Sequence, residues 1–309
     1  MDYSQRISHR QWNQPDKGVR ESQRERTFID DIVQKDHLQR ALLDSLEGVR
    51  TVFDGGAGSG RFSILLAQRG LSVTHFDISA PMIDQAREAA QAAGALDRIT
   101  FVQGALEDLS AYADGAFDLV ISFDAPICYT YPNHERVIAS LARIARKRLL
   151  VSVASRLGAL PYRANPLQKH PYILSDQPED PWARWCLEHE ADLVEDFRFD
   201  KAGAEDFLAR GGFGEEEAIA AYEAGEAPWP ITYHFMPDEL KRILAANGLR
   251  DVRLAGPGAY ARTLPRPILR KLMADPDQRR DFLDFCYQYD QNPYVLGMGK
   301  DNLLARGEK

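Results

Sequence analysis

A short run of glycines after an acidic residue is the part of this sequence best suited to holding a ligand. Residues 51–63 read TVFDGGAGSGRFS, so Asp54 is followed at alternate positions by Gly56, Gly58 and Gly60. Glycine adopts backbone angles that a side chain would forbid, and it lets a ligand lie directly on the main chain. The apolar residues before the turn predict a strand and those after it a helix. The glycines therefore lie in a strand-to-helix turn built to hold something.

The spacing of these glycines argues against two common phosphate-binding loops. A dinucleotide-binding turn needs glycine at its first, third and sixth positions, but the sixth position here is Arg61 or Ser63, depending on where the count starts. No Gly-Lys-Ser/Thr follows Gly60, as a nucleotide-hydrolase loop requires. The carboxylate of Asp54 would repel a pyrophosphate and would suit a ligand with an ammonium or sulfonium group.

A second acidic residue ends the next predicted strand. The segment LSVTHFDIS alternates from Leu71 and places Asp77 at its end, 23 residues after Asp54. An acidic side chain at this point can accept hydrogen bonds from both hydroxyls of a ribose. A structural turn, or an Asp that caps a helix near Ser79, would explain either feature alone. Their order and distance together favour a ligand that contains a nucleoside.

The pattern D-x-G-x-G-x-G resembles the first motif of class I S-adenosylmethionine-dependent methyltransferases. The phrase DGGAGSGRFSILLAQRG followed by VTHFDIS is similar to the small-molecule and tRNA-type members in particular. The resemblance implies S-adenosyl-L-methionine as the cofactor and S-adenosyl-L-homocysteine as the product. It also implies an α/β, Rossmann-like fold with a seven-stranded sheet, mostly parallel, whose last strand is antiparallel, with helical lid insertions.

The resemblance also assigns roles to single residues around the predicted cofactor. Asp54 and the three glycines would surround its methionine end, Asp77 would bind the ribose and Ile78 would pack on the adenine. The predicted cofactor-binding residues are Asp54, Gly56, Gly58, Gly60, Asp77, Ile78, Leu106, Glu107 and Phe123.

The third motif departs from the family pattern. FVQGALEDL has Ala105 where an acidic residue is common. The adenine amino group would then rely on Glu107, on Asp108 or on the backbone.

Strands and helices alternate along most of the chain, which predicts right-handed crossovers and a parallel sheet. Strands are predicted over 50–54, 72–77, 98–103, 117–123, 148–154, 249–255 and from Asp301 onward, and helices over 59–69, 80–93, 133–146 and 237–246. Ligands of such sheets bind at the carboxyl ends of the strands, where both Asp54 and Asp77 fall.

Four regions follow from this pattern. Residues 1–48 are expected to form an N-terminal helical cap, with an amphipathic helical segment over 21–47, and residues 49–155 a Rossmann-like cofactor-binding core. Residues 156–235 break the alternation and are predicted to form a lid over the substrate, with Tyr162, Trp182 and Trp229 as candidate acceptor contacts. Residues 236–309 would complete the core, with a helical insertion near 264–290.

Candidate catalytic residues follow the fourth core strand, whose carboxyl end faces the transferable methyl group in the family. They are Asp124, Tyr129 and His134, with Tyr131 and His37 as further candidate acceptor contacts. The tyrosine rings could orient an acceptor or attract the sulfonium. Methyl transfer has a neutral thioether as leaving group, so no obligatory base is expected.

Composition narrows the remaining classes. The chain has 309 residues, a net charge of −8 and no apolar run long enough for a membrane span. Three separated cysteines and a polar N-terminus without a secretion signal predict a cytoplasmic protein. The seven histidines show no metal-ligand spacing, so no metal is predicted, although an oxygen-only magnesium site at Asp124 stays open.

Three functions remain open. The first is methyl transfer to a small-molecule acceptor. The second is methylation of tRNA, suggested by the family likeness and by the basic segments IARKR (144–148) and RTLPRPILRK (262–271). The third is a protein that binds the cofactor without catalysis. The acceptor, the atom that is methylated and the oligomeric state do not follow from the sequence.

Overall fold

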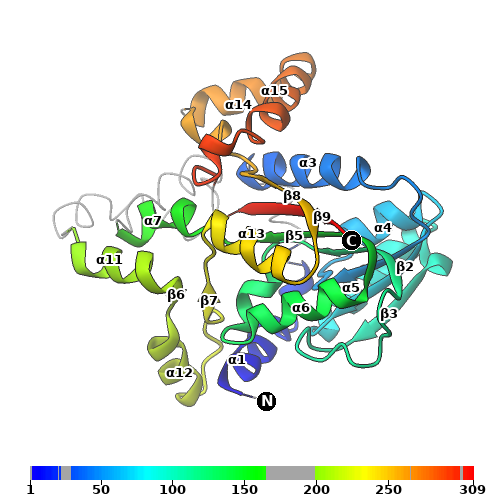
Figure 1. The fold of residues 1–309 in the computed structure, drawn as a ribbon, viewed down its shortest axis with the longest axis horizontal. Helices are drawn as coiled ribbons and strands as arrows, with labels where there is room; N and C mark the ends of the chain where they lie inside the picture. The colour runs from blue at the N-terminus through cyan, green and yellow to red at the C-terminus, as the bar shows by residue number, and fades with distance from the viewer. Residues whose placement is uncertain (1, 20, 22–28, 165–198, 265, 300–301) are drawn as a thin grey trace.

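The computed structural model describes residues 2–19, 21, 29–164, 199–264, 266–299 and 302–309. Their centre is one seven-stranded sheet with the strand order β3-β2-β1-β4-β5-β9-β8 (Figure 1). The strands are β1 (Thr51–Gly55), β2 (Ser72–Asp77), β3 (Ile99–Gln103), β4 (Phe117–Ser122), β5 (Ala145–Val153), β8 (Arg250–Ala255) and β9 (Leu303–Glu308). Strands β1 to β5 pair in parallel, and β9 runs antiparallel to both β5 and β8. The predicted sheet with a reversed last strand is confirmed.

Helices cover both faces of the sheet because every central strand alternates between two apolar cores. Along β4, Val120 enters one core, and Leu119 and Ile121 enter the other. The first core packs under α6 (His134–Ile144) and α13 (Pro237–Ala246), and the second under α3 (Ile29–Leu43), α4 (Arg61–Ala67) and α5 (Ala80–Ala92). Most predicted boundaries agree with the structure. Strand β5 begins earlier than predicted, at Ala145, because this residue pairs with Phe117.

The N-terminal region contains a helix that the sequence analysis did not predict, α1 (Tyr3–Trp12). It starts with a capping box in which Asp2 and Gln5 each satisfy the backbone of the other. Its buried positions, Ser4, Ile7, Ser8 and Gln11, have helical spacing but are mostly polar, so no apolar stripe marks it. Of the predicted segment 21–47, the described helix is α3.

The described elements of the predicted lid region lie beside and below the sheet in Figure 1. They are α7 (Arg156–Ala164), α11 (Lys201–Arg210), β6 (Gly212–Phe213), α12 (Glu215–Glu223) and β7 (Thr232–Tyr233). Helix α12 packs against α1: the Tyr3 hydroxyl donates to Glu223, and the Arg10 guanidinium donates to the Tyr222 carbonyl. Helix α1 of the predicted cap and helix α12 of the predicted lid therefore pack together, and we call this pair of helices the roof.

The predicted C-terminal insertion is a pair of helices, α14 (Arg266–Ala274) and α15 (Pro276–Tyr289), which pack on α3 at the top of Figure 1. Short 3₁₀ turns connect the larger elements: η1 (Leu96–Arg98), η2 (Pro126–Thr130), η4 (Ala261–Thr263) and η5 (Pro293–Val295). Within the described part of the chain, no helix combines the length and the apolar character needed to cross a membrane.

Candidate cofactor and acceptor site

A cavity of about 770 Å³ opens at the carboxyl ends of the central strands. This volume lies within the range of about 300 to 1,000 Å³ that is usual for small-molecule sites. Asp54, Asp77, Phe123 and Ala154 line the cavity from the strand ends, and Trp12 of α1 and Ala218 of α12 are among the residues that line it from the roof. The site therefore lies where a parallel sheet of this topology places its ligand.

The glycine turn lines one end of this cavity. Gly56, Gly58 and Gly60 all have positive φ, of 71°, 54° and 84°. The amides of Gly56 and Ala57 donate to the Phe76 carbonyl at 2.8 and 3.2 Å, which ties the turn to β2. A side chain at Gly56 would meet Pro126, whereas the space around the Gly58 Cα is open. The open backbone at Gly58 is the part of the turn on which a ligand can lie.

Asp77 is fixed by backbone donors on both of its oxygens. Gly58 N–H donates to Oδ2 and Ser79 N–H donates to Oδ1, each at 2.8 Å. Burial raises the pKa of this carboxyl, and the backbone hydrogen bonds oppose the rise. Each carboxylate oxygen keeps a further lone pair, so the oriented group can accept hydrogen bonds from two neighbouring hydroxyls.

Asp54 is more deeply enclosed, with 2% of its surface exposed. Its Oδ2 accepts a hydrogen bond of 2.7 Å from the Ser63 hydroxyl, which also lies 3.1 Å from His75 Nδ1. Burial raises the pKa of Asp54 to about 7, the Ser63 bond opposes this, and the nearby Asp77 carboxylate adds to it. Burial also lowers the pKa of His75 to about 4, so this ring is neutral. The pair Ser63 and His75 supports Asp54 and was missed in the sequence, because a helix and a neighbouring strand bring it there.

The cavity is also lined by Ile78, Leu106 and Glu107. Burial raises the pKa of the Glu107 carboxyl. Asp108 is exposed, binds Ser110 and does not line the cavity. Of the two acidic candidates beside Ala105, Glu107 is the one placed to meet a bound ligand.

The end of β4 has unusual backbone geometry. Asp124 and Ala125 both adopt positive φ, of 66° and 65°, which side chains other than glycine rarely do. Such strain persists where surrounding contacts fix it, often at functional sites. The Asp124 amide donates to Ser152 Oγ at 2.8 Å, and its carboxylate forms an ion pair with Lys35 of α3. The backbone amide of Asp124 is thus held by β5 and its carboxylate by α3.

Three aromatic rings line the cavity beyond Asp124. Trp12 lies 5.5 Å from Tyr129 and 5.5 Å from Trp229 between ring centroids, and Tyr129 lies 5.9 Å from Trp229. The structure brings together two predicted residues, Tyr129 and Trp229, and adds Trp12, which the sequence analysis did not select. Trp12 was not selected because its segment is mostly polar and shows no periodic apolar pattern. We call these three residues the aromatic trio.

Other predicted acceptor and catalytic residues do not line this cavity. His37 is buried against Asp290, with 3.5 Å between Nδ1 and Oδ2, and against the Tyr287 ring. His134 lies buried between Tyr131 and Tyr233, with ring centroids at 5.7 and 3.9 Å. Burial lowers the pKa of His134. Neither these two histidines nor Tyr131 is carried into the function proposed below.

The side chains of the other two predicted lid aromatics lie outside the described residues. Tyr162 belongs to α7, but its side chain lies outside the described residues. Trp182 lies entirely outside the described residues.

The structure also adds polar lining residues that no sequence motif marked. They are Glu21, Gln34, Glu217, His234 and Asn302. Each comes from a different segment, so no local spacing relates them. Among the described residues, no group of three or more His, Cys, Asp or Glu side chains is placed to hold a metal ion.

Comparison with known proteins agrees with this geometry. Residues 52–148 match the sequence profile of the family described as "Methyltransferase domain". The tRNA 5-carboxymethoxyuridine methyltransferase of Escherichia coli K12 is 36% identical over 84 residues, which are 27% of this chain and 32% of that protein. The chloroplastic magnesium protoporphyrin IX methyltransferase of Arabidopsis thaliana is 38% identical over 113 residues, 36% of this chain and 35% of that protein. The matches thus span about a third of these relatives.

A solved S-adenosylmethionine dependent methyltransferase from Mesorhizobium loti aligns with 87% of this chain and 95% of its own, at 17% identity and a TM-score of 0.49. The profile match coincides with β1 to β5 and contains the glycine turn, Asp77 and the end of β4. Residues 52–148 therefore match a methyltransferase domain, and this match together with the sheet order supports a class I, S-adenosylmethionine-dependent methyltransferase.

Proposed function

We propose that this protein transfers a methyl group from S-adenosylmethionine to a small-molecule acceptor. The observation that carries the proposal is a single cavity that runs from the glycine turn to the aromatic trio under a roof of α1 and α12. The volume of this cavity suits a cofactor together with a small acceptor. Its walls come from the core, the N-terminal cap and the lid region.

The cofactor would lie along the glycine turn. Its positively charged methionine end and its adenine end would meet different residues. Asp54 and the turn would meet the methionine end, where ammonium and sulfonium groups are attracted by a carboxylate. Asp77 would accept hydrogen bonds from the ribose hydroxyls, and Ile78, Leu106 and Glu107 would surround the adenine. Phe123, at the end of β4, would face the middle of the cofactor.

Catalysis would rest mainly on orientation. The acceptor atom attacks the methyl carbon in line with the bond to sulfur, and the neutral thioether leaves without a proton. Alignment of two reactants is worth up to about 7 to 11 kcal/mol in favourable intramolecular models. Helices α1 and α12 would cover part of the cavity, and Asp124 and Tyr129 line the region where the acceptor would be oriented. No described residue needs to act as an obligatory base.

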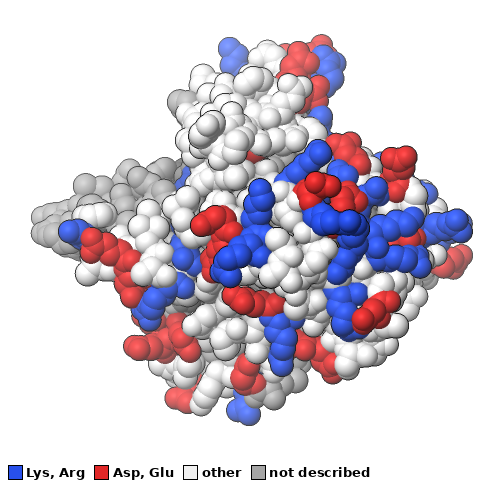
Figure 2. Space-filling model, viewed as in Figure 1, with Lys and Arg blue, Asp and Glu red and all other residues white. Residues whose placement is uncertain are grey.

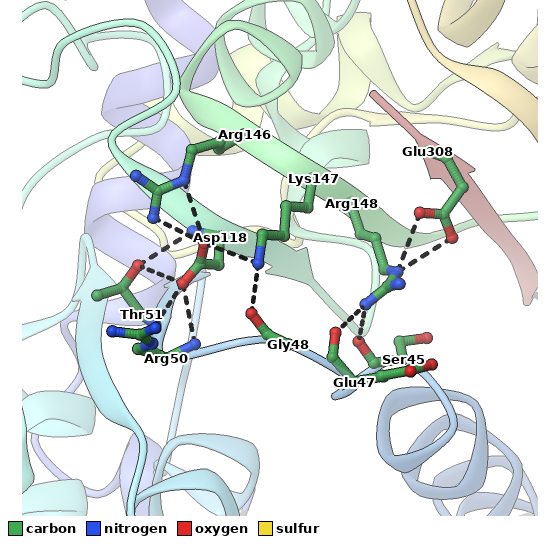
Figure 3. A network of polar contacts seen from close by, with 10 residues as sticks. All are labelled: Ser45, Glu47, Gly48, Arg50, Thr51, Asp118, Arg146, Lys147, Arg148 and Glu308. Atoms are coloured by element: carbon green, nitrogen blue, oxygen red, sulfur yellow. Dashed lines mark hydrogen bonds and ion pairs between the residues drawn. The ribbon is translucent and has the colours of Figure 1, made fainter.

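A tRNA acceptor is the second candidate, because one relative is named for tRNA methylation. The basic segment 144–148 gives it little support. Arg146 binds Asp118, Lys147 binds the Gly48 carbonyl, and Arg148 binds Glu308 (Figure 3). These contacts lie at the amino ends of β4 and β5, the end of the sheet opposite to the cavity.

The second basic segment, 262–271, begins with Arg262, whose guanidinium donates to the carbonyls of Gly158 and Gly299. On the face shown in Figure 2, positive and negative side chains are interspersed. On this face the charges do not form the continuous positive surface that a polyanion requires.

The test is a labelling experiment with a matched control. The protein is incubated with methyl-labelled S-adenosylmethionine and a cell extract separated into small molecules, RNA and protein. We expect label in the small-molecule fraction, and none with Asp77→Ala protein. Label in RNA would replace this proposal with the second candidate. Calorimetric binding of the cofactor without label in any fraction would instead indicate a non-catalytic binding protein.

A further inference from the structure

The cavity is lined by many carboxylates and few positive charges. Among the described lining residues, Arg61 is the one Lys or Arg. The acidic lining residues are Glu21, Asp54, Asp77, Glu107, Asp124 and Glu217. Such a lining disfavours an anionic acceptor and favours one that brings positive charge or hydrogen-bond donors.

Most of these carboxylates already have a counterpart. Asp54 and Asp77 belong to the proposed cofactor end. Glu21 forms an ion pair of 3.0 Å with Lys17, and Asp124 forms one with Lys35. Glu217 differs, because no described cation pairs with it and its side chain is exposed on α12. It is a net negative charge on the acceptor side of the cavity.

The aromatic trio adds the second feature that suits a cation. Ring faces of Trp and Tyr attract ammonium groups within about 6 Å of their centroids. Two of these rings already lie within this distance of an ammonium group. Lys17 Nζ is 4.5 Å from the centroid of Trp12 and 5.2 Å from that of Trp229. Lys17 itself does not line the cavity, and its charge is matched by Glu21.

Asn302 supplies a third, independent feature. Its side chain is 6% exposed and lines the cavity, and its Oδ1 has no hydrogen-bond partner among the described residues. A buried carbonyl oxygen without a donor is costly, and a ligand N–H would satisfy it. The assigned oxygen is an acceptor, so the complementary ligand group is a donor.

We propose that the acceptor is an amine, held in the region bounded by the aromatic trio, the Glu217 carboxylate and Asn302 Oδ1. This inference rests on the function proposed above and names the acceptor's chemical class. An ammonium that enters this region first releases a proton to water, which frees the nitrogen lone pair. The lone pair then forms the bond to the methyl carbon, and the bond from that carbon to sulfur breaks with its electron pair left on sulfur.

The carboxylates that line the cavity would stabilise the transition state as well as the bound acceptor, because of how charge moves in the reaction. The sulfonium becomes a neutral thioether, and its positive charge passes to the methylated nitrogen. Positive charge therefore develops on nitrogen in the transition state, where Glu217 and the ring faces stabilise it. A hydroxyl or carboxylate acceptor would end neutral and would gain nothing from these carboxylates.

The test uses three probes with the same ring: phenethylamine, phenethyl alcohol and phenylacetate. Each is titrated into the full chain saturated with S-adenosylhomocysteine, and methyl transfer from labelled cofactor is measured in parallel. We expect phenethylamine to bind about tenfold more tightly than the other two. We expect Glu217→Gln to weaken that binding by about five- to tenfold, because the amide keeps the shape and removes the charge.

Glu216→Gln is the matched control. Glu216 is exposed on the same helix but does not line the cavity, so this change should leave all three titrations as they were. If S-adenosylhomocysteine binds but the amine has no advantage, or if both variants behave alike, the amine assignment is overturned and the methyltransferase proposal stands. If S-adenosylhomocysteine itself does not bind, the proposed function fails, and the inference fails with it.

Discussion

Lys35, in the N-terminal helix α3, forms an ion pair with Asp124 at the end of β4. The two side chains differ sharply in exposure, with 2% for Lys35 and 34% for Asp124. The Lys35 ammonium is therefore buried at this pair, whereas the Asp124 carboxylate also lines the cavity. This pair connects the N-terminal cap to the strand end where methyl transfer is proposed.

The difference in exposure predicts unequal effects on stability. Asp124→Asn removes the carboxylate that pairs with the buried ammonium of Lys35, and we expect it to lower the free energy of unfolding by about 3 to 5 kcal/mol. Lys35→Met leaves a carboxylate that water can reach, at a cost of about 1 to 2 kcal/mol. Urea unfolding of both variants measures the difference.

The double variant is the control for this pair. Because it removes both charges, it should be more stable than Asp124→Asn alone. Equal losses in the two single variants would contradict the proposed dependence of Lys35 on Asp124.

Cofactor binding should depend on pH through Asp54. Its raised pKa of about 7 means that the empty site binds a proton that a cationic cofactor must displace. We expect affinity for S-adenosylmethionine to rise with pH through about 7, and to fall by up to about tenfold per unit below it. Calorimetry at several pH values measures this slope, and comparison with Asp54→Asn removes the contribution of the cofactor's own titration. Equal slopes in the two proteins would rule out Asp54 as the titrating group.

The same group should have the opposite effect on the stability of the empty protein. Because its folded-state pKa is raised, its contribution to stability is complete below the ordinary value of 3.8 and is lost as the pH rises through about 7. Saturating cofactor should reduce this loss. Thermal unfolding with and without S-adenosylhomocysteine across this pH window provides the measurement.

Alanine substitutions in the glycine turn should separate the cost of a steric clash from the cost of a side chain at positive φ. At Gly56 a new Cβ would clash with the Pro126 ring, whereas at Gly58 nothing lies within 4 Å. We expect Gly58→Ala to cost about 1 to 2 kcal/mol from its positive φ alone, and Gly56→Ala to cost about 1 to 3 kcal/mol more. Chemical denaturation tests the order.

Gly70→Ala is the control for strain, since Gly70 also has positive φ and open space but lies outside the cavity. It should match Gly58→Ala in stability. Only Gly58→Ala should weaken cofactor binding, and equal binding by both variants would remove Gly58 from the proposed cofactor contacts.

Asp77→Ala should weaken cofactor binding by about 1 to 3 kcal/mol through lost hydrogen bonds. It should also destabilise the turn, because the amides of Gly58 and Ser79 lose their acceptor. Asp108→Ala is the control, as this carboxylate is exposed and binds Ser110. Unchanged calorimetric affinity in a folded Asp77→Ala protein would refute the ribose assignment.

Arg146 should contribute to stability above about pH 4 and not to methyl transfer. Burial alone would raise the pKa of Asp118, but hydrogen bonds from Arg146 and from the amides of Arg50 and Thr51 hold it at about 2. The contribution of Asp118 is therefore present above the ordinary value of 3.8 and is lost as the pH falls through about 2. Arg146→Gln should reduce stability near neutral pH more than at pH about 2, at unchanged methyl transfer. A loss of RNA methylation in this variant would revive the tRNA candidate.

The sequence by itself determined the parts of this protein that depend on local order. Alternating strand and helix patterns fixed the sheet, because a parallel strand needs a crossover and the crossover has one favoured hand. The glycine spacing and the carboxylates Asp54 and Asp77 marked the cofactor end, since each sits at a strand terminus whose position the fold determines.

Only the tertiary structure decided what encloses the acceptor. The aromatic trio joins residues 12, 129 and 229, and the buried ion pair joins Lys35 to Asp124. Helix α1 was missed because its buried face is mostly polar, and it is held by contacts with Tyr129 and Tyr222 that no local pattern contains. Packing between distant segments creates these neighbours, so spacing along the chain predicts the cofactor turn but not the walls around the acceptor.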